Sequence, residues 1–234
     1  MTDVRIAKFI ADTGAASRRG AEALITSGSV AVNGTVVVSP VFFVNPDTDV
    51  VTVDGRIVRP RAKTELYAFH KPLNTMTTTR DPNGRRTIYD CLPEKYKSLK
   101  YVGRLDYKTT GLLLMTNDGD LARRLTLPAS HIPRTYIATV NGTDMRGLDA
   151  ARRGITVDGV SYRPMDIVEL GGANLRITVD EGKKNEIRIV LRACHLPVRR
   201  LHRISFGPIA LGDIKVGQIR PVSQKTIDEL LKSL

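Results

Sequence analysis

A polar loop between two apolar segments holds the residues of this sequence that are best suited to chemistry. A predicted strand ends at Val102, the loop follows over Gly103–Thr110, and an apolar strand is predicted over Gly111–Thr116. A loop between two buried strands is a rigid platform for a reactive side chain. The loop offers Arg104 and Asp106, and a carboxylate held there can act as a nucleophile or an electrostatic partner. An isolated loop aspartate often only caps a turn, so Asp106 needs further support.

The charge of the chain indicates a polyanionic partner. The 234 residues carry 36 Lys and Arg against 24 Asp and Glu, for a net charge of +12. Such an excess favours nucleic acid over a small neutral metabolite. An acidic membrane surface fits less well, because no stretch approaches the roughly 20 apolar residues of a membrane span. The start of the sequence has no basic segment leading into an apolar run. We therefore expect a soluble, cytoplasmic protein.

Cysteine and histidine give no sign of a metal or redox site. Cys91 and Cys194 are the only cysteines and lie far apart, so we expect reduced thiols and no disulfide framework. The four histidines show no metal-ligand spacing, and none is paired with a nucleophile. We expect no metal.

Residues 1–60 are predicted to form a small module of two helices and a twisted sheet. Apolar spacing predicts a helix over residues 4–10, and a second helix has Ser17 as its N-cap and Gly28 as its stop. The Asn33–Gly34 pair between β-rich runs is a strong hairpin signal, and a third strand follows it.

A linker is predicted over residues 61–65, because the segment from Val58 to Glu65 is rich in Pro and basic residues and has no periodicity. A second domain then covers residues 66–234. Up to position 61 there are seven basic and six acidic residues, which leaves 29 basic and 18 acidic residues for the rest. Most of the charge that attracts a polyanion therefore lies in the part that also holds Asp106.

Further elements of the second domain follow from its patterns. We expect strands over residues 66–71 and 134–140, helices over residues 118–125 and 185–193, and an amphipathic helix at the C-terminus. Alternation at Arg199, Leu201 and Arg203 predicts a strand with one wet and one buried face. The wet face could meet RNA or be a plain solvated edge.

The N-terminal module resembles the small RNA-binding module of the S-four type, named for a ribosomal small-subunit protein. The matching residues are Lys8, Phe9, Ser17–Arg19, Val32–Gly34 and Val53–Gly55. The resemblance implies that the second helix binds structured RNA, with Arg18 and Arg19 contacting phosphates. On charge alone, an ordinary solvated helix surface was an equal alternative.

The second domain resembles the pseudouridine synthases of the RsuA/RluB type. The central match comprises Gly103–Asp106, Thr110–Leu114 and Thr116–Gly119; His70–Pro72 with Asp81, Gly84, Arg85 and Thr87 precede it, and Arg134–Tyr136, Glu181–Arg188, Gly207 and Leu211 follow it. Together with the module, the resemblance covers nearly the full chain. It implies an α+β protein, with a mixed, mainly antiparallel sheet flanked by helices in the catalytic domain.

The resemblance implies an activity and roles for single residues. The activity is the isomerisation of uridine to pseudouridine in ribosomal RNA by base flipping, without a cofactor. Asp106 is the implied catalytic carboxylate, Arg188 the adjacent cation that keeps it charged, and Tyr136 the side chain that stacks on the base and moves a proton. Arg104 is expected to enter the RNA stack where the uridine leaves. The further expected RNA contacts are Lys71, Arg85, Arg134, Lys183 and Lys184.

Departures from the family pattern leave these groups in place. Arg134 stands where many relatives have Lys, and Ile189 replaces a second basic residue, which puts an RNA contact there in doubt. Glu186 stands where many relatives have Gln, and it favours the branch that modifies large-subunit ribosomal RNA over the small-subunit branch.

Two other classes of function compete with this interpretation. A non-catalytic RNA-binding or ribosome-assembly factor would need the module and the basic body, but it would not need Asp106, Tyr136 and Arg188 together. A nuclease or methyltransferase is disfavoured, because the sequence lacks clustered acids for two metal ions and a glycine-rich nucleotide loop. We expect a monomer whose partner is ribosomal RNA or a ribosomal assembly intermediate.

Overall fold

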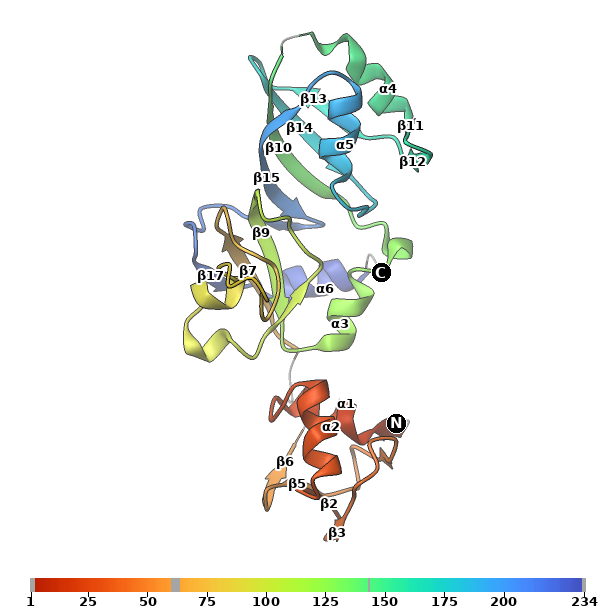
Figure 1. Cartoon of the computed structure of the whole chain (residues 1–234), viewed down its shortest axis with the longest axis vertical. Coiled ribbons are helices and arrows are strands. Elements are labelled where there is room, and N and C mark those ends of the chain that lie inside the picture. The colour runs from red at the N-terminus through yellow and green to blue at the C-terminus, as the bar shows by residue number, and fades with distance from the viewer. Residues whose placement is uncertain (1–2, 60–63, 143, 233–234) are drawn as a thin grey trace. The chain divides into compact units, whose positions relative to one another are not determined.

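The computed structural model describes residues 3–59, 64–142 and 144–232 (Figure 1). The chain divides into two compact units, Met1–Thr64 with Asn117–Gly119 and Glu65–Thr116 with Asp120–Leu234. Residues 61–63 of the predicted linker lie outside the described residues. No helix within the described ranges is long and apolar enough to cross a membrane.

The described residues of the N-terminal unit form two helices and two small sheets. The helices are α1 (Ile6–Thr13) and α2 (Arg18–Thr26). Strands β1 (Val4–Arg5) and β4 (Phe43–Val44) pair with each other, and the second sheet has the order β3 (Thr35–Val36), β2 (Val30–Val32), β5 (Val51–Val53) and β6 (Arg56–Val58). The helix pair and the hairpin are confirmed. The first helix begins at Ile6, two residues later than predicted, and β1, β4 and β6 were not predicted.

Local signals account for most of this unit. The Ser17 side chain accepts a hydrogen bond from the Gly20 amide and so caps α2. Asn33 and Gly34 adopt φ angles of 50° and 83°, as a tight hairpin turn requires. The apolar faces of α1 and α2 bury their side chains against the valines of the sheet. The strands that were missed are two or three residues long, which is too short for a period of two to be visible.

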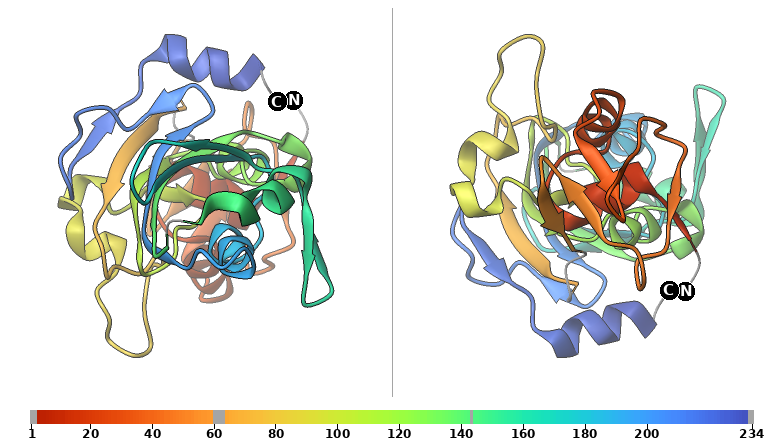
Figure 2. Two further views of the ribbon diagram at one scale, coloured as in Figure 1. Left: turned by 90° about the horizontal axis from the view of Figure 1, so that it is seen from above. Right: turned by 90° about the horizontal axis from the view of Figure 1, so that it is seen from below.

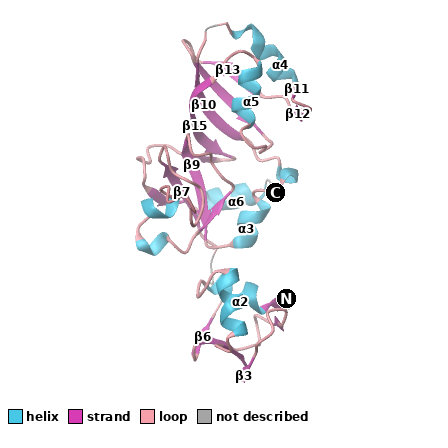
Figure 3. Cartoon of the chain, in the orientation of Figure 1, coloured by secondary structure: helices cyan, strands magenta, loops and turns pink. Residues whose placement is uncertain are grey.

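The larger unit is built on a sheet with nine strands among the described residues, and Figure 3 shows its strands in magenta. Its main path runs β13 (Asp166–Glu169), β14 (Asn174–Val179), β10 (Arg134–Val140), β15 (Val198–Phe206), β9 (Thr109–Thr116), β7 (Leu66–Lys71) and β17 (Ile219–Pro221); β16 (Ile209–Ala210) pairs with β15, and β8 (Lys100–Val102) pairs with β9. Only β15 and β9 are parallel among these pairs of described strands. The predicted mixed, mainly antiparallel sheet is confirmed.

Helices cover both faces of this sheet. They are α3 (Gly119–Arg124), α4 (Leu148–Arg153), α5 (Glu186–Ala193) and α6 (Gln224–Lys232), with short 3-10 helices at Ile88–Cys91, Glu94–Tyr96, Pro128–Ser130 and Met145–Gly147 and a separate hairpin of β11 (Ile155–Val157) and β12 (Val160–Tyr162). Leu113 and Met115 of β9 pack into the core that α4 and α5 cover, whereas Leu112 and Leu114 pack into the core of α3 and α6. The views in Figure 2 show α5 and α6 on different sides of the sheet. The strand β9 is therefore buried on both faces.

Gly111 allows the parallel junction at the centre of the sheet. It lies opposite Arg203 in the β9–β15 pair and has a φ of +106°. A Cβ atom at this position would lie 2.2 Å from the Arg203 carbonyl oxygen. The close approach of the two strands therefore excludes any side chain here.

We expect Gly111→Ala to lower the free energy of unfolding by about 3 kcal/mol, because it adds both backbone strain and a backbone clash. Urea unfolding of the full chain measures this loss. Gly172→Ala is the matched control, since Gly172 also has a positive φ, of +57°, but has open space around it. The control should lose only about 1 kcal/mol. Equal losses in the two variants would contradict the clash.

Candidate active site

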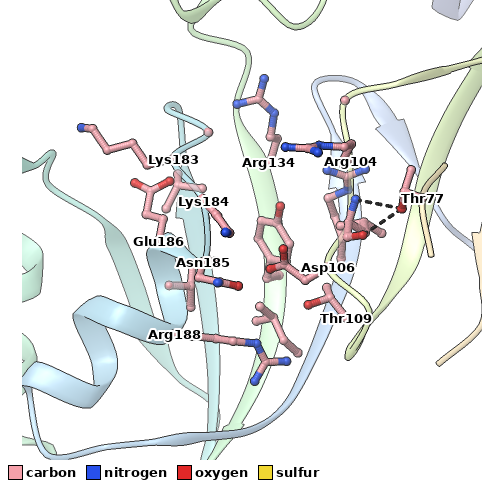
Figure 4. Close-up of a pocket in the computed structure, with 18 of the residues that line it drawn as sticks. Thr77, Arg104, Asp106, Thr109, Arg134, Lys183, Lys184, Asn185, Glu186 and Arg188 are labelled. Carbon is pink, nitrogen blue, oxygen red and sulfur yellow. Dashed lines mark hydrogen bonds between the residues drawn. The ribbon is translucent and has the colours of Figure 1, made fainter. Parts of the chain in front are cut away.

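A pocket of about 460 Å³ opens in the larger unit between the loop that precedes β9, the strands β10 and β15, and the start of α5. Most of its polar lining is charged. These residues are Arg104, Asp106, Arg134, Glu181, Lys183, Lys184, Glu186, Arg188 and Arg203, and Tyr136 contributes an aromatic ring. Segments far apart in the sequence therefore meet at one site, as Figure 4 shows.

Backbone and core contacts fix the loop that carries Asp106. The neighbouring Leu105 is 4% exposed and anchors the loop in the core. The Thr77 hydroxyl donates to the Leu105 carbonyl oxygen at 2.8 Å and accepts from its amide at 3.3 Å. The Thr109 amide donates to the Asp106 carbonyl oxygen at 3.0 Å. The Asp106 side chain is exposed and points into the pocket (Figure 4).

Arg188 lies in the same pocket but is held by backbone oxygens. Its guanidinium donates to the carbonyl oxygens of Val198, at 3.2 Å, and Lys108, at 2.9 Å. Burial lowers the pKa of Arg188, and the charge of Asp106 acts in the opposite direction. Among the described residues the two side chains do not form an ion pair within 4 Å. The structure therefore places the expected cation near Asp106 without a direct contact.

Tyr136 and Arg134 form the floor of the pocket on β10. Tyr136 is 9% exposed, so its ring is largely buried beneath the open space. The Arg134 guanidinium lies 5.0 Å from the centre of the Phe206 ring and donates to the Glu181 carbonyl oxygen at 3.0 Å. Burial lowers the pKa of Arg134. The guanidinium of Arg134 thus already makes contacts within the protein.

Lys71 does not fit its predicted contact with RNA. The side chain is 0% exposed, and its ammonium group donates to the carbonyl oxygens of Thr109, at 2.9 Å, and Pro72, at 3.1 Å. Burial lowers its pKa to about 8, and the charge of Asp106 partly opposes this shift. Lys71 therefore links β7 to the start of β9 from inside the protein.

The other predicted RNA contacts fall into three groups. Arg104, Lys183 and Lys184 are exposed and line the pocket. Arg85 lies outside the pocket lining and forms a bidentate ion pair with Asp81, which is held in the loop after β7. Arg18 and Arg19 are exposed on α2 of the N-terminal unit.

Several polar residues of the pocket were not predicted as site residues, and the buried ones Thr109, Glu186 and Arg203 are among them. Arg203 was expected on a wet strand face, and this is wrong: it is 2% exposed, and its Nε donates to the Leu112 carbonyl oxygen at 2.6 Å. Leu201 and Arg203 are two residues apart and therefore lie on the same face of β15. Their spacing predicts that both side chains are exposed or that both are buried. The period of two, applied from the apolar Leu201, would have predicted a buried Arg203.

The cysteines and the other titratable groups form no metal site within the described part of the chain. No three His, Cys, Asp or Glu side chains there are grouped to hold an ion. Both cysteines are free thiols, with Cys194 buried and Cys91 partly buried.

The fold and the site together define an enzyme that works on a polyanion: a basic pocket surrounds one exposed carboxylate on a rigid loop. Residues 65–193 match the RNA pseudouridylate synthase family, and residues 4–50 match the S4 domain. The chain therefore belongs to the RNA pseudouridylate synthase family and carries an N-terminal S4 domain.

Similar proteins support this assignment over the whole length. A protein of Aquifex aeolicus (strain VF5), described as an uncharacterized RNA pseudouridine synthase, is 41% identical over 100% of this chain and 96% of its own length. A Mycobacterium tuberculosis (strain H37Rv) protein with a similar description is 36% identical over 99% and 94%. A crystal structure of a pseudouridylate synthase matches with a TM-score of 0.69 and 27% identity, covering 97% of this chain and 99% of that one. The predicted activity, pseudouridine synthesis in RNA, is confirmed at this level.

Proposed function

We propose that this pseudouridine synthase modifies a uridine of ribosomal RNA, and that it acts as a monomer on the RNA or on an assembly intermediate. The main support is the combination of an S4 domain with a basic pocket around an exposed carboxylate in one chain. Both features suit a large structured RNA, in which one surface holds the backbone and another holds a single nucleotide. Glu186, through the family resemblance, favours large-subunit RNA.

Asp106 is the proposed catalytic carboxylate. The reaction breaks the bond between uracil N1 and the ribose, turns the base and joins C5 to the same ribose carbon. It is an isomerisation in which all atoms are conserved, because C5 loses one proton and N1 gains one. A carboxylate can attack the sugar or the base, or stabilise positive charge on the detached sugar. Among the pocket carboxylates, Glu181 pairs with Lys183 and Glu186 is buried. Asp106 is thus the one that is exposed and has no cation within 4 Å among the described residues.

The neighbouring side chains suit the remaining tasks. A stacked uridine hides its reacting atoms, so the nucleotide must be flipped out of the RNA, and exposed Arg104 can fill the space it leaves. Tyr136 can stack on the flipped base and carry a proton during the rearrangement. Arg188 supplies positive potential close to Asp106. Lys183 and Lys184 can contact phosphates beside the pocket.

Pseudouridine mapping by carbodiimide primer extension tests the proposed substrate. Unmodified large-subunit and small-subunit ribosomal RNAs are each incubated with the wild-type protein and with Asp106→Ala. We expect a new stop in the large-subunit RNA that is absent with the variant. A stop only in the small-subunit RNA would contradict the large-subunit assignment. No stop in either naked RNA, followed by a stop in isolated assembly intermediates, would identify the particle as the substrate.

The S4 domain should contribute phosphate contacts through α2. We expect the double variant Arg18→Gln, Arg19→Gln to bind ribosomal RNA more weakly and to lower the slope of log K against log salt by about 1 for each lost phosphate contact. Filter binding between about 50 and 200 mM salt measures the slope. Arg56→Gln, on β6 of the same unit, is the matched control. An unchanged slope in the double variant would exclude these arginines from the interface.

A further inference from the structure

Three buried side-chain atoms in the described part of the chain have no hydrogen-bond partner: Thr109 Oγ1, Glu186 Oε1 and Arg203 Nη2. All three residues line the same pocket. Buried polar atoms are nearly always hydrogen-bonded in proteins, and exceptions gather at functional sites. The most unusual of the three is Glu186, because a carboxylate with an unpartnered buried oxygen is costly when it is charged.

Glu186 is the first residue of α5 and is 5% exposed. Its carboxyl group lies within hydrogen-bonding reach of the carboxyl group of Glu181, while its Oε1 atom has no partner. Two carboxyl groups in contact cannot both be ionised at low cost, and a hydrogen bond between them requires a proton on one. The two carboxyl groups are therefore expected to share one proton. Glu186 is the more buried of the two, so the proton is more stable there.

The cations around the pair do not neutralise Glu186. Lys183 forms its ion pair with Glu181 and also donates to the Ser161 carbonyl oxygen at 2.8 Å. Arg134, facing from β10, donates to the Glu181 backbone, and Arg203, from β15, donates to Leu112. The backbone amide of Arg163, the residue that follows β12, donates to the Glu181 carboxylate at 2.8 Å.

The pKa directions of the two carboxyl groups follow from this burial and contact. Burial, followed by the hydrogen bond and charge of Glu181, raises the pKa of Glu186 to about 8. Burial acts to raise the pKa of Glu181 as well, but Lys183 and the Arg163 amide more than offset it, and the net direction is down. The N-terminus of α5 favours a negative charge at Glu186, but burial and the charge of Glu181 act in the opposite direction, and the net shift of the pKa is upward.

We propose that Glu186 is a positioning residue that works in its neutral form, sharing one proton with Glu181 and holding the segment 181–185 against the start of α5. This segment is one wall of the pocket, and α5 carries Arg188. Ionisation of Glu186 would place two repelling charges at the junction and displace the wall. The inference rests on the proposed role of Arg188 in catalysis.

The charge state is tested directly by carbon-13 NMR of the full-length protein with labelled glutamate carboxyl groups. Glu186→Gln assigns the signal, because the variant lacks it. We expect the assigned carboxyl group to titrate with a midpoint above pH 7, and to titrate at lower pH in Glu181→Gln. Asp180→Asn is the matched control, because Asp180 pairs with Arg163 instead and should leave the midpoint unchanged. A midpoint near the ordinary glutamate value in the wild-type protein overturns the proposal.

The positioning role is tested by the pH profile of turnover on large-subunit ribosomal RNA. Wild-type turnover should fall about tenfold between pH 7 and pH 9, as the neutral form of a group with a midpoint near 8 is depleted. Glu186→Gln should stay within about threefold of wild type at pH 7 and keep its rate at pH 9, because an amide cannot ionise. A Glu186→Gln variant that falls as steeply as the wild type overturns the role. If the wild type forms no product in this RNA, the substrate proposed above fails, while the NMR midpoint still decides the charge state.

Discussion

Asp106→Asn should reduce turnover by at least about 1000-fold while leaving folding and RNA affinity close to those of the wild type. The carboxylate is exposed on its loop, and the contacts that hold the loop involve Leu105, Thr77 and backbone groups. An amide has a similar shape but cannot act as a nucleophile or carry the negative charge. Single-turnover pseudouridine formation measures the rate, and filter binding measures the affinity.

Asp166→Asn is the matched control for this prediction. Asp166 is an exposed aspartate of the same unit, on β13, and it does not line the pocket. This variant should keep its full rate. Activity of Asp106→Asn within tenfold of wild type would rule out the catalytic role of Asp106.

Arg188→Met should lower kcat/KM by about 100-fold, with most of the loss in kcat. The substitution removes the positive potential near Asp106. It also removes the two hydrogen bonds that tie α5 to the carbonyl oxygens of Lys108 and Val198. Lys108 belongs to the loop that carries Asp106, so the loss affects both the charge and the position of the carboxylate.

Arg188→Lys separates these two effects. Lysine keeps the charge but cannot present the planar fork that reaches two carbonyl oxygens at once. We expect this variant to lie between the wild type and Arg188→Met, and the difference between the variants measures the contribution of charge. Urea unfolding checks that both variants remain folded. If Arg188→Met kept its kcat and changed only KM, Arg188 would be a binding residue instead.

Much of the fold could be predicted because its signals are local. The cap at Ser17, the turn at Asn33–Gly34 and the apolar run of β9 each depend on a few neighbouring residues. The order of the strands in the sheet could not be read in this way. The parallel pairing of β9 with β15 joins segments about 90 residues apart, and no local pattern encodes it.

The candidate site was predicted in part. The strand of Tyr136 was predicted with its observed bounds, whereas β9 begins at Thr109 inside the predicted loop of Asp106 and the helix of Arg188 begins one residue later than predicted. The structure brings all three elements to one pocket. The sequence also identified basic residues, but it could not tell the exposed ones from the buried ones. Lys184 is exposed at the pocket, whereas Lys71 is fully buried.

The sequence by itself determined the loop that carries Asp106, the helix pair of the S4 domain and the excess of positive charge, because residue type and short-range spacing specify them. The proposed role of Asp106 came from the family resemblance. Only the tertiary structure decided what surrounds each charge. It buries Lys71 within reach of the charge of Asp106, places the Arg203 guanidinium 6.0 Å from the centre of the Tyr136 ring and brings Glu186 close to Glu181. The physical reason is that burial and the pKa depend on contacts between strands and loops that are distant in sequence, and these contacts exist only once the sheet has formed.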